Sequence, residues 1–381
     1  MVSPVLRKQH ILIVFGTRPE AIKMVPVVQA LKAQPGIRAT LCVTVQHRKM
    51  LDQVLSIAGL TPDIDLDLML PNQSLGDLLA RMVTAVGMVL DRERPDRVLV
   101  HGDAMTAFAT ALSAYYRRIP IAHVEAGLRT GDADNPWPEE ANRRAIAAMA
   151  DLHFAPTDLA ARALMQEGVD VASIHVTSNT VVDALQATRA ALTADAQLAS
   201  DLEALAGRFA GKHVVLATAH RRENFGMAMH RIGAALARLA HRTDLVLVCP
   251  LHANPNVRPV LAAHLAGRAN AIILDPLDYP SFVSLLSMST LILTDSGGIQ
   301  EEAPAFGKPV LVLRHTTERP EGLEAGTAKL VGTDTDRIVA EASALLDDPA
   351  RYSAMARAHN PFGDGRAAER IAAILAAEAK F

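Results

Sequence analysis

The sequence predicts an α/β protein with two Rossmann-like, doubly wound parallel-sheet domains. Short apolar runs alternate with helical patterns along nearly the whole chain, which is typical of parallel strands joined by helices. This alternation begins afresh near residue 214, and 381 residues are enough for two domains. Aromatic residues make up only 4% of the chain, so the predicted core is mainly aliphatic, as in helices packed on buried strands.

The apolar runs define the predicted strands. In the first half they lie at 11–15, 39–45, 97–101, 121–125, 152–155 and 174–176, with helical patterns such as 74–91 and 104–117 between them. In the second half they lie at 214–218, 245–249, 271–274, 291–295 and 310–313. An Ala-rich helical segment is predicted at 190–211, and a last helix at 365–381. We place the boundary after Ser178, so that the domains span 1–178 and 179–364.

Composition excludes several classes of protein. With 38 basic and 41 acidic residues the net charge is −3, which gives no electrostatic argument for binding nucleic acid or an acidic membrane. The sequence shows no hydrophobic signal core and no apolar stretch of about 20 residues, so a soluble cytoplasmic protein is expected. Cys42 and Cys249 lie in strand-like runs without C-x-x-C spacing, so we expect two buried thiols and no metal site.

The segment 10–24, HILIVFGTRPEAIKM, leads from a strand into a helix. Thr17 and Glu20 have the spacing of a capping box, and Arg18 and Lys23 place two cations at the same helix start. Free backbone N–H groups, the helix dipole and these cations together predict an anion site. Because G-x-G-x-x-G is missing, the anion is predicted to be a phosphorylated ligand that need not be NAD.

The segment 293–303, LTDSGGIQEEA, carries a second element of this kind. Ser296, Gly297 and Gly298 follow a strand and open a helix, where backbone N–H groups and a hydroxyl could hold a diphosphate. Glu302 lies further along that helix and could accept hydrogen bonds from ribose hydroxyls. The alternative is an ordinary turn followed by glutamates on a solvated helix face.

Candidate acid and base groups follow the predicted strands. Asp103 and Glu125 end neighbouring strands, Glu139 stands at a helix start, and His220 follows strand 214–218. The alternatives are a helix cap for Asp103, dipole compensation for Glu139 or Glu140, and a structural role for His220. In open α/β sheets ligands bind beyond the carboxyl ends of the strands, where all of these strand-end residues are expected.

Several motifs together resemble one family. FGTRPEAIKM, VTVQHRKMLDQVL, HGD at 101–103, HVEAGLRTGD, PWPEEANRR, AHRREN, LTDSGGIQEEAPAFGKPVLVLR and TTERPE occur in order along the chain. They resemble the non-hydrolysing UDP-N-acetylglucosamine 2-epimerases of bacteria. The resemblance implies the twin domains of UDP-glycosyltransferases (GT-B type) facing a central cleft, with the last helix packing back on the first domain. It also implies a homodimer and no cofactor.

The resemblance further implies the reaction and its residues. UDP-GlcNAc and UDP-ManNAc would interconvert by anti elimination of UDP to a bound 2-acetamidoglucal, followed by re-addition. Asp103, Glu125 and Glu139 would be the acid and base groups, with His220 beside the diphosphate. The implied substrate ligands are Arg18, Lys23, Phe282, Ser296, Gly297, Gly298, Glu302 and Arg319. The residues implied for a second, activating UDP-GlcNAc are Gln46, Glu140, Arg221 and His252.

The sequence departs from the family pattern at two places, and four other functions are alternatives to the epimerase. Ala104 and Met105 replace two hydroxyl residues after Asp103, and Ser178 replaces a glycine near the domain boundary. The alternative functions are a hydrolysing 2-epimerase, an epimerase of a related UDP-diacetamido sugar, a glycosyltransferase of the same fold, and a nucleotide-sugar sensor without turnover. Acid and base groups on adjacent strand ends favour an epimerase over a transferase.

Overall fold

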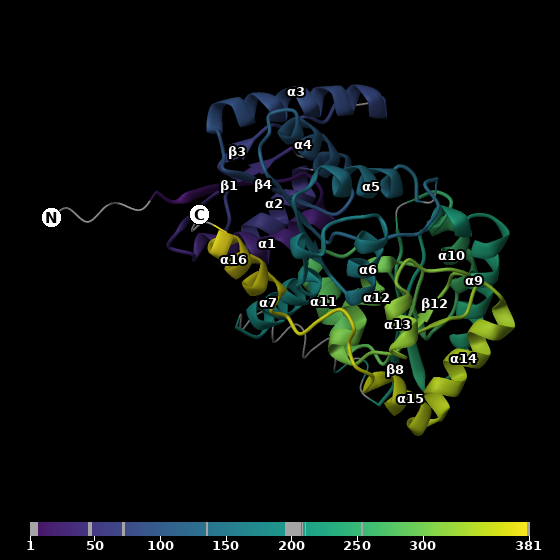
Figure 1. Cartoon of the computed structure of the whole chain (residues 1–381). Coiled ribbons are helices and arrows are strands. Elements are labelled where there is room, and N and C mark those ends of the chain that lie inside the picture. Colours follow the sequence, from purple (N-terminus) through teal and green to yellow (C-terminus); the bar gives the residue numbers. More distant parts are fainter. Residues whose placement is uncertain are drawn as a thin grey trace. The chain divides into compact units, whose positions relative to one another are not determined.

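The computed structural model describes residues 7–44, 48–70, 73–134, 136–194, 207, 209, 211–252 and 254–378. The chain forms two compact units, coloured along the sequence in Figure 1. Unit 1 takes in the described residues up to Ala184 and from Phe362 onward, and unit 2 those from Leu185 to Pro361. The sequence placed the boundary after Ser178, and the structure places it six residues later, after Ala184.

Unit 1 is built on a seven-stranded parallel sheet with the order β3-β2-β1-β4-β5-β6-β7. Its strands are β1 (Gln9–Phe15), β2 (Ile37–Val43), β3 (Ile64–Asp65), β4 (Arg97–His101), β5 (Ile121–Val124), β6 (Leu152–Ala155) and β7 (Ile174–Val176). Its helices are α1 (Arg18–Lys32), α2 (Arg48–Ile57), α3 (Leu75–Glu93), α4 (Met105–Tyr115), α5 (Glu139–Met149), α6 (Asp158–Gln166), the short η1 (Val171–Ser173) and α16 (Ala367–Glu378), while α7 (Thr180–Ala194) runs from unit 1 into unit 2.

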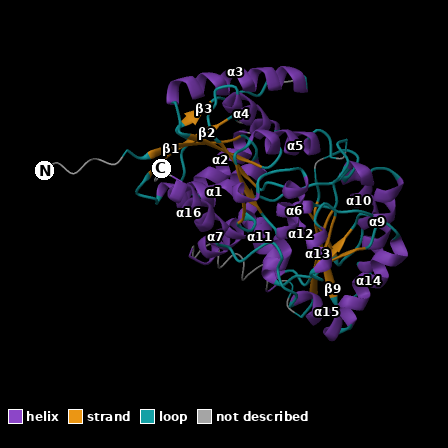
Figure 2. Ribbon diagram, viewed as in Figure 1, coloured by secondary structure: helices purple, strands orange, loops and turns teal. Residues whose placement is uncertain are grey.

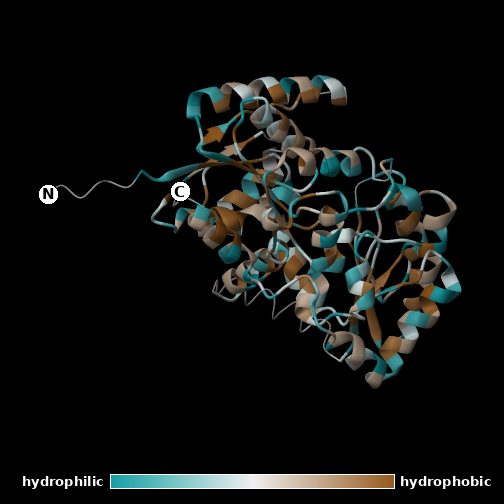
Figure 3. Ribbon diagram, viewed as in Figure 1, coloured by the Kyte–Doolittle hydropathy of each residue, from teal (hydrophilic) through white to brown (hydrophobic). Residues whose placement is uncertain are grey.

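Alternate residues of β1 build the two cores of unit 1. Ile11, Ile13 and Phe15 pack with α1, α2 and α16 on one face, whereas Leu12 and Val14 pack with α3, α4 and α5 on the other. This follows from the two-residue period of a strand, and it explains why the run is apolar throughout. Figure 2 shows the strands covered by helices, and Figure 3 shows them largely brown.

Unit 2 repeats this plan with a six-stranded parallel sheet in the order β10-β9-β8-β11-β12-β13. The strands are β8 (His213–Thr218), β9 (Leu245–Pro250), β10 (Ala271–Leu274), β11 (Leu291–Thr294), β12 (Val310–Val312) and β13 (Ala328–Leu330). The helical elements are η2 (Arg222–Asn224), α9 (Met227–Leu239), α10 (Arg258–Leu265), α11 (Tyr279–Met288), α12 (Gly297–Glu302), η3 (Ala303–Phe306), α13 (Pro320–Glu324), α14 (Thr335–Asp347) and α15 (Pro349–Ala356).

The predicted fold class, two doubly wound parallel α/β units, is confirmed. Two short strands, β3 and β13, were not predicted. Of the helix predicted at 190–211, residues 190–194 form the end of α7, which starts earlier; most of the remainder lies outside the described residues. None of the described helices combines the length and apolar character that crossing a bilayer requires.

Candidate active site

Both sheets reverse their winding direction between two strands, and the predicted site residues follow those strands. In unit 1 the reversal lies between β1 and β4, after which come Arg18 and Asp103. In unit 2 it lies between β8 and β11, after which come His220 and Ser296. Such switch points leave a crevice between diverging loops, and ligands of open α/β sheets bind there.

The helix start after β1 is capped from within. Thr17 Oγ1 accepts from the backbone N–H of Glu20, and the Glu20 carboxylate accepts from the N–H of Thr17 at 2.8 Å, which confirms the capping box. The same carboxylate accepts from the N–H of Gly16 at 3.1 Å. The expectation that the N–H groups at this helix start are free is therefore wrong for Gly16 and Thr17. Burial raises the pKa of Glu20 to about 7.

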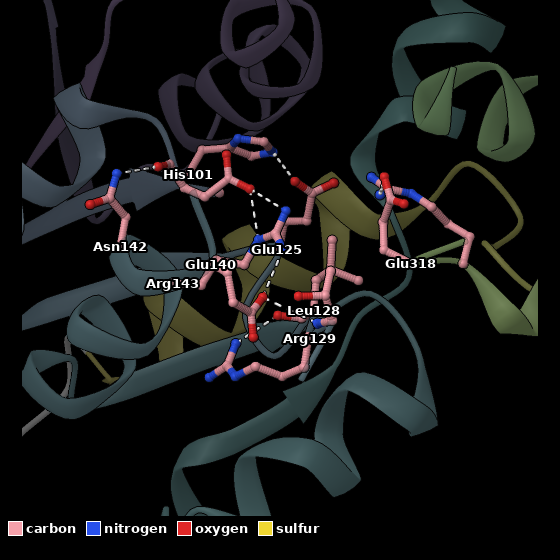
Figure 4. Close-up of polar contacts among 12 residues, drawn as sticks. His101, Glu125, Leu128, Arg129, Glu140, Asn142, Arg143 and Glu318 are labelled. Atoms are coloured by element: carbon pink, nitrogen blue, oxygen red, sulfur yellow. Dashed lines mark hydrogen bonds and ion pairs between the residues drawn. The ribbon is translucent and has the colours of Figure 1, made fainter. Parts of the chain in front are cut away.

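Asp103 is held by an arginine that the sequence did not single out. Arg143 of α5 donates through Nε and Nη2 to Asp103 Oδ2, at 2.7 and 2.6 Å. Its Nη1 donates to Glu140 Oε2 at 3.0 Å, and Asn142 donates to the backbone oxygen of Asp103 (Figure 4). The cap at the start of α4 is Ala104, which has no capping side chain, so Asp103 is not a helix cap.

Glu125 occupies a strained and largely buried position directly after β5. Its φ is +62°, a value that costs a residue with a side chain on the order of 1–3 kcal/mol. Lys23 forms an ion pair with its Oε1, to which Asn179 Nδ2 also donates at 3.2 Å. His101 Nε2 of β4 lies 3.7 Å from Oε2 (Figure 4). Lys23 thus pairs with a candidate catalytic carboxylate in this structure.

Glu139 and Glu140 begin α5 but have different surroundings. Glu139 is half-buried, and its carboxylate makes no hydrogen bond or ion pair with another described residue. Glu140 is fully buried and accepts from Arg143, from Arg144 and from the backbone N–H of Thr130. Glu140 therefore holds α5 to the loop after β5.

A buried carboxylate organises the switch point of unit 2. Asp295 follows β11 and accepts from the backbone N–H groups of His220 and Arg221 and from Asn224 Nδ2 at 2.9 Å. His220 Nδ1 lies 3.4 Å from Asp295 Oδ1, and its ring stacks on His252 with centroids 5.8 Å apart. Burial lowers the pKa of His220 although Asp295 opposes this, which favours a neutral imidazole at pH 7.

The glycines at the start of α12 have different structural roles. A Cβ on Gly297 would lie 2.9 Å from Glu318 Oε1 and 3.0 Å from Arg319 Cζ, so a side chain at this position would require these two buried groups to shift. A Cβ on Gly298 would meet nothing closer than Ser296 Oγ at 4.0 Å. Ser296 is the N-cap residue of α12, and its side chain makes no cap hydrogen bond, which leaves the hydroxyl able to turn toward a ligand.

Buried ion pairs lie behind these glycines. Arg319 donates to Glu301 at 2.9 Å and pairs with Glu318 at 2.7 Å, and Glu318 also pairs with Arg314 and Arg221. Although burial opposes ionisation of Glu318, the three arginines hold its pKa well below the usual range. Glu301 and Glu302 are both buried, so the alternative of a solvated glutamate face is wrong.

The remaining predicted residues are spread over both units. Glu302 accepts from the Tyr279 hydroxyl at 3.4 Å, and Phe282 is half-buried on α11. His252 follows β9 and lies against His220. Gln46 lies outside the described residues. No group of three or more potential metal ligands gathers within the described part of the chain.

Several residues that organise the site were not predicted individually: Arg143, Asn179, Asp295 and Glu318. Each lies in or beside a motif, namely PWPEEANRR, the S-N-T triplet at 178–180, LTDSGG and TTERPE. The four motifs could therefore be recognised in the sequence, but the partner of each of these side chains could not be predicted from it.

Known proteins resemble this chain over nearly its whole length. The family model for UDP-N-acetylglucosamine 2-epimerase matches residues 29–376. A probable UDP-N-acetylglucosamine 2-epimerase of Ralstonia nicotianae is 52% identical over 371 residues, covering 97% of this chain and 99% of that protein. The UDP-N-acetylglucosamine 2-epimerase of Escherichia coli K12 is 50% identical over 367 residues, covering 96% and 98%.

A solved structure agrees with these sequence relatives. The crystal structure of UDP-GlcNAc 2-epimerase from Neisseria meningitidis bound to UDP-GlcNAc has a TM-score of 0.91 and 46% identity, and the match covers 96% of this chain and 99% of that one. Fold, motifs and full-length identity therefore agree, and the chain belongs to the UDP-N-acetylglucosamine 2-epimerase family, a family of isomerases.

Proposed function

We propose that this chain interconverts UDP-GlcNAc and UDP-ManNAc without releasing free sugar, by anti elimination of UDP and its re-addition. The single observation that carries the proposal is the pair of carboxylates Asp103 and Glu125. They follow β4 and β5, which pair in parallel with His101 opposite Val124, so both carboxylates lie at the same edge of the sheet. Each has its own cation, Arg143 for Asp103 and Lys23 for Glu125.

The chemistry requires two proton-transfer groups because inversion at C2 needs a proton to leave one face and return to the other. The C2 proton is not adjacent to a carbonyl, so its direct removal is very unfavourable. As the C1–O bond to UDP breaks, the growing positive charge at C1 makes the C2 proton removable, and 2-acetamidoglucal and UDP result. Re-addition of UDP to C1 with a proton delivered to the opposite face of C2 gives the epimer.

Asp103, Glu125 and Glu139 are the proposed proton-transfer groups, and the assignment of each to one face of the sugar stays open. Glu125 is largely buried and held by partners, as expected of a group that must be positioned accurately. Glu139 is half-buried in the first turn of α5, and its carboxylate has no partner among the described residues. Each therefore has a different environment from which to give or take a proton.

Unit 2 supplies the proposed nucleotide-binding groups. The backbone at Gly297 and Gly298, the Ser296 hydroxyl and the neutral imidazole of His220 would hold the diphosphate as charge develops on it. Glu302, buried beside Tyr279, would accept from the ribose, with Phe282 on the same side. Arg18 of unit 1 and Arg319 of unit 2 complete the proposed ligands. The proposal needs no redox cofactor.

Regulation and assembly form a second part of the proposal. Activation by a further UDP-GlcNAc would involve Gln46, Glu140, Arg221 and His252, and it predicts a sigmoidal dependence of rate on substrate. Strictly hyperbolic kinetics would contradict this activation. A homodimer predicts a mass in solution twice that of one chain, which light scattering after gel filtration measures.

Proton NMR of UDP-GlcNAc incubated with the pure protein in D2O tests the reaction. The expected result is UDP-ManNAc together with deuterium at C2 of both nucleotide sugars. Free ManNAc with UDP would instead indicate hydrolysis, and an unchanged spectrum would contradict the proposed substrate. The Asp103→Asn variant, which keeps the size of the side chain, should lose the exchange of C2 hydrogen with solvent.

A second labelling experiment tests the elimination itself. UDP-GlcNAc with oxygen-18 in the bridge between C1 and phosphorus should scramble the label into non-bridging positions of the β-phosphate, because the released phosphate can rotate before it adds back. Epimerisation with no scrambling would contradict cleavage of the C1–O bond.

A further inference from the structure

Two segments just inside the limits of unit 1 lie against each other where the chain passes between the units. These crossing segments are residues 177–183, before the division in α7, and residues 362–370, which return to unit 1. Asn179 N–H donates to the backbone oxygen of Phe362 at 2.8 Å, and Asp183 accepts from the N–H groups of Ala367 and Ala368. The crossing segments are thus joined by buried hydrogen bonds.

The backbone is strained at Ser178, where the crossing segments pack against each other. Ser178 has a φ of +74°, an unfavourable value for any residue with a side chain. A Cβ on Gly363 would lie only 2.4 Å from Ser178 Cβ, so no side chain fits at Gly363. The two crossing segments are therefore in tight contact next to Asn179.

Asn179 also reaches a candidate catalytic group. It is 3% exposed, and its Nδ2 donates to Glu125 Oε1 at 3.2 Å. Its Oδ1 accepts from the N–H of Val181 at 3.0 Å, in the first turn of α7. Because only the oxygen end can accept from that N–H group, this contact directs the NH2 end toward Glu125.

We propose that Asn179 is a positioning residue for Glu125, whose carboxylate it ties to both crossing segments. The proposal rests on the proposed function, in which Glu125 transfers a proton at C2. This carboxylate is faced by Lys23 from α1, His101 from β4 and Asn179 from the crossing segment. Of these, Asn179 lies in a crossing segment itself and links Glu125 to Phe362 in the other crossing segment.

The Asn179→Asp variant separates this role from a purely structural one. Aspartate keeps the oxygen that accepts from Val181 N–H and keeps the backbone bond to Phe362, so the fold is preserved. It replaces the donor to Glu125 with a second carboxylate, and a like charge at this distance disfavours ionisation of Glu125. The Asn179→Ser variant keeps an acceptor for the helix start but removes the amide donor without adding charge.

The experiment compares kcat as a function of pH for wild type, Asn179→Asp, Asn179→Ser and the neighbouring control Ser178→Gly. We expect the acidic limb of the profile to move up by about one pH unit or more in Asn179→Asp. We expect Asn179→Ser to lower kcat without such a shift. Ser178→Gly relieves backbone strain and should leave both the rate and the profile unchanged.

A direct titration makes the result independent of activity. Ligand-free protein labelled with carbon-13 in its glutamate carboxyl groups is titrated by NMR, and the Glu125→Gln variant assigns the Glu125 signal. The signal should titrate at higher pH in Asn179→Asp than in wild type. An unshifted signal, or equal pH profiles in Asn179→Asp and Asn179→Ser, would overturn the inference. A wild-type protein inactive on UDP-GlcNAc would overturn the proposed function, and the carbon signal would still test the contact.

Discussion

Arg143 is the side chain on which the position of Asp103 depends most directly. It is 7% exposed and joins Asp103 to the buried carboxylate of Glu140, so one planar guanidinium connects the end of β4 to the start of α5. A lysine carries the same charge but lacks the fork that reaches both carboxylates at once. The geometry of Asp103, rather than the charge near it, is what a lysine at this position would change.

The Arg143→Lys variant should therefore lower kcat by roughly 10- to 100-fold, with a smaller effect on KM, because a small misplacement of a reacting group is costly. Steady-state kinetics with UDP-GlcNAc measures this. Arg144→Lys is the matched control, since Arg144 is exposed and donates to the other oxygen of Glu140, at 3.3 Å. Equal losses in the two variants would show that Asp103 does not depend on Arg143.

Glu20 links the capping of α1 to pH. Burial raises its pKa from 4.5 to about 7, so between these values the folded chain binds a proton that the unfolded chain releases. The stability that Glu20 contributes is thus fully present below pH 4.5 and is lost as the pH rises through about 7. Relative to Glu20→Gln, which does not titrate, wild type should lose about 2–3 kcal/mol of unfolding free energy between pH 5 and 8. Urea unfolding at both pH values measures the difference, and a pH-independent difference would contradict the prediction.

Among the secondary-structure elements, α4 starts without a capping side chain. Ala104 occupies the N-cap with φ −61° and ψ 155°, a backbone conformation in which a serine could accept from the first turn. This is one of the positions at which the chain departs from the family pattern. Because the hydroxyl is missing, the first turn of α4 lacks a side-chain cap hydrogen bond directly beside Asp103.

The Ala104→Ser variant should stabilise the protein by about 1 kcal/mol in urea unfolding, because it supplies the missing cap. Ser74→Ala is the matched control in the opposite direction, since Ser74 caps α3 and accepts from the N–H of Asp77 at 3.1 Å. That variant should lose a similar amount. No gain in Ala104→Ser alongside a loss in Ser74→Ala would show that the hydroxyl cannot reach the first turn of α4.

The elements that the sequence predicted are those with a continuous apolar run. β4, β6, β7 and β10 have the predicted bounds. β4 and β6 are buried along their whole length, as expected of strands inside a parallel sheet, whereas β7 and β10 are only partly buried. β3 (Ile-Asp) and β13 (Ala-Lys-Leu) are short and each contains a charged residue, so neither forms an apolar run. The positions of Asp103 and Glu125 at strand ends were predictable for the same reason. Their partners were not: Arg143 is 40 residues from Asp103 and Asn179 is 54 from Glu125, and strand order alone brings them together.

Across the whole molecule, the same winding order occurs twice, and each unit carries polar loops where its sheet reverses direction. Unit 1 nevertheless consists of two distant parts of the chain. α16, the last described helix, packs on α1, and its Ile371 and Leu375 are fully buried in the core that also contains Ile11 and Phe15. The stability of unit 1 therefore depends on residues at the far end of the sequence.

The Ile371→Ala variant should lower the unfolding free energy by about 2–5 kcal/mol, because it leaves a cavity in a fully buried site. Hydrogen exchange should then accelerate at the amides of β1 and α1 in unit 1, whereas the amides of β8 and β11 in unit 2 should keep their protection, since each unit has a core of its own. Ile374→Ala, at a partly buried position of the same helix, is the control and should cost less. Equal acceleration in both units would mean that the two cores unfold together, so that loss of α16 packing is felt throughout the chain.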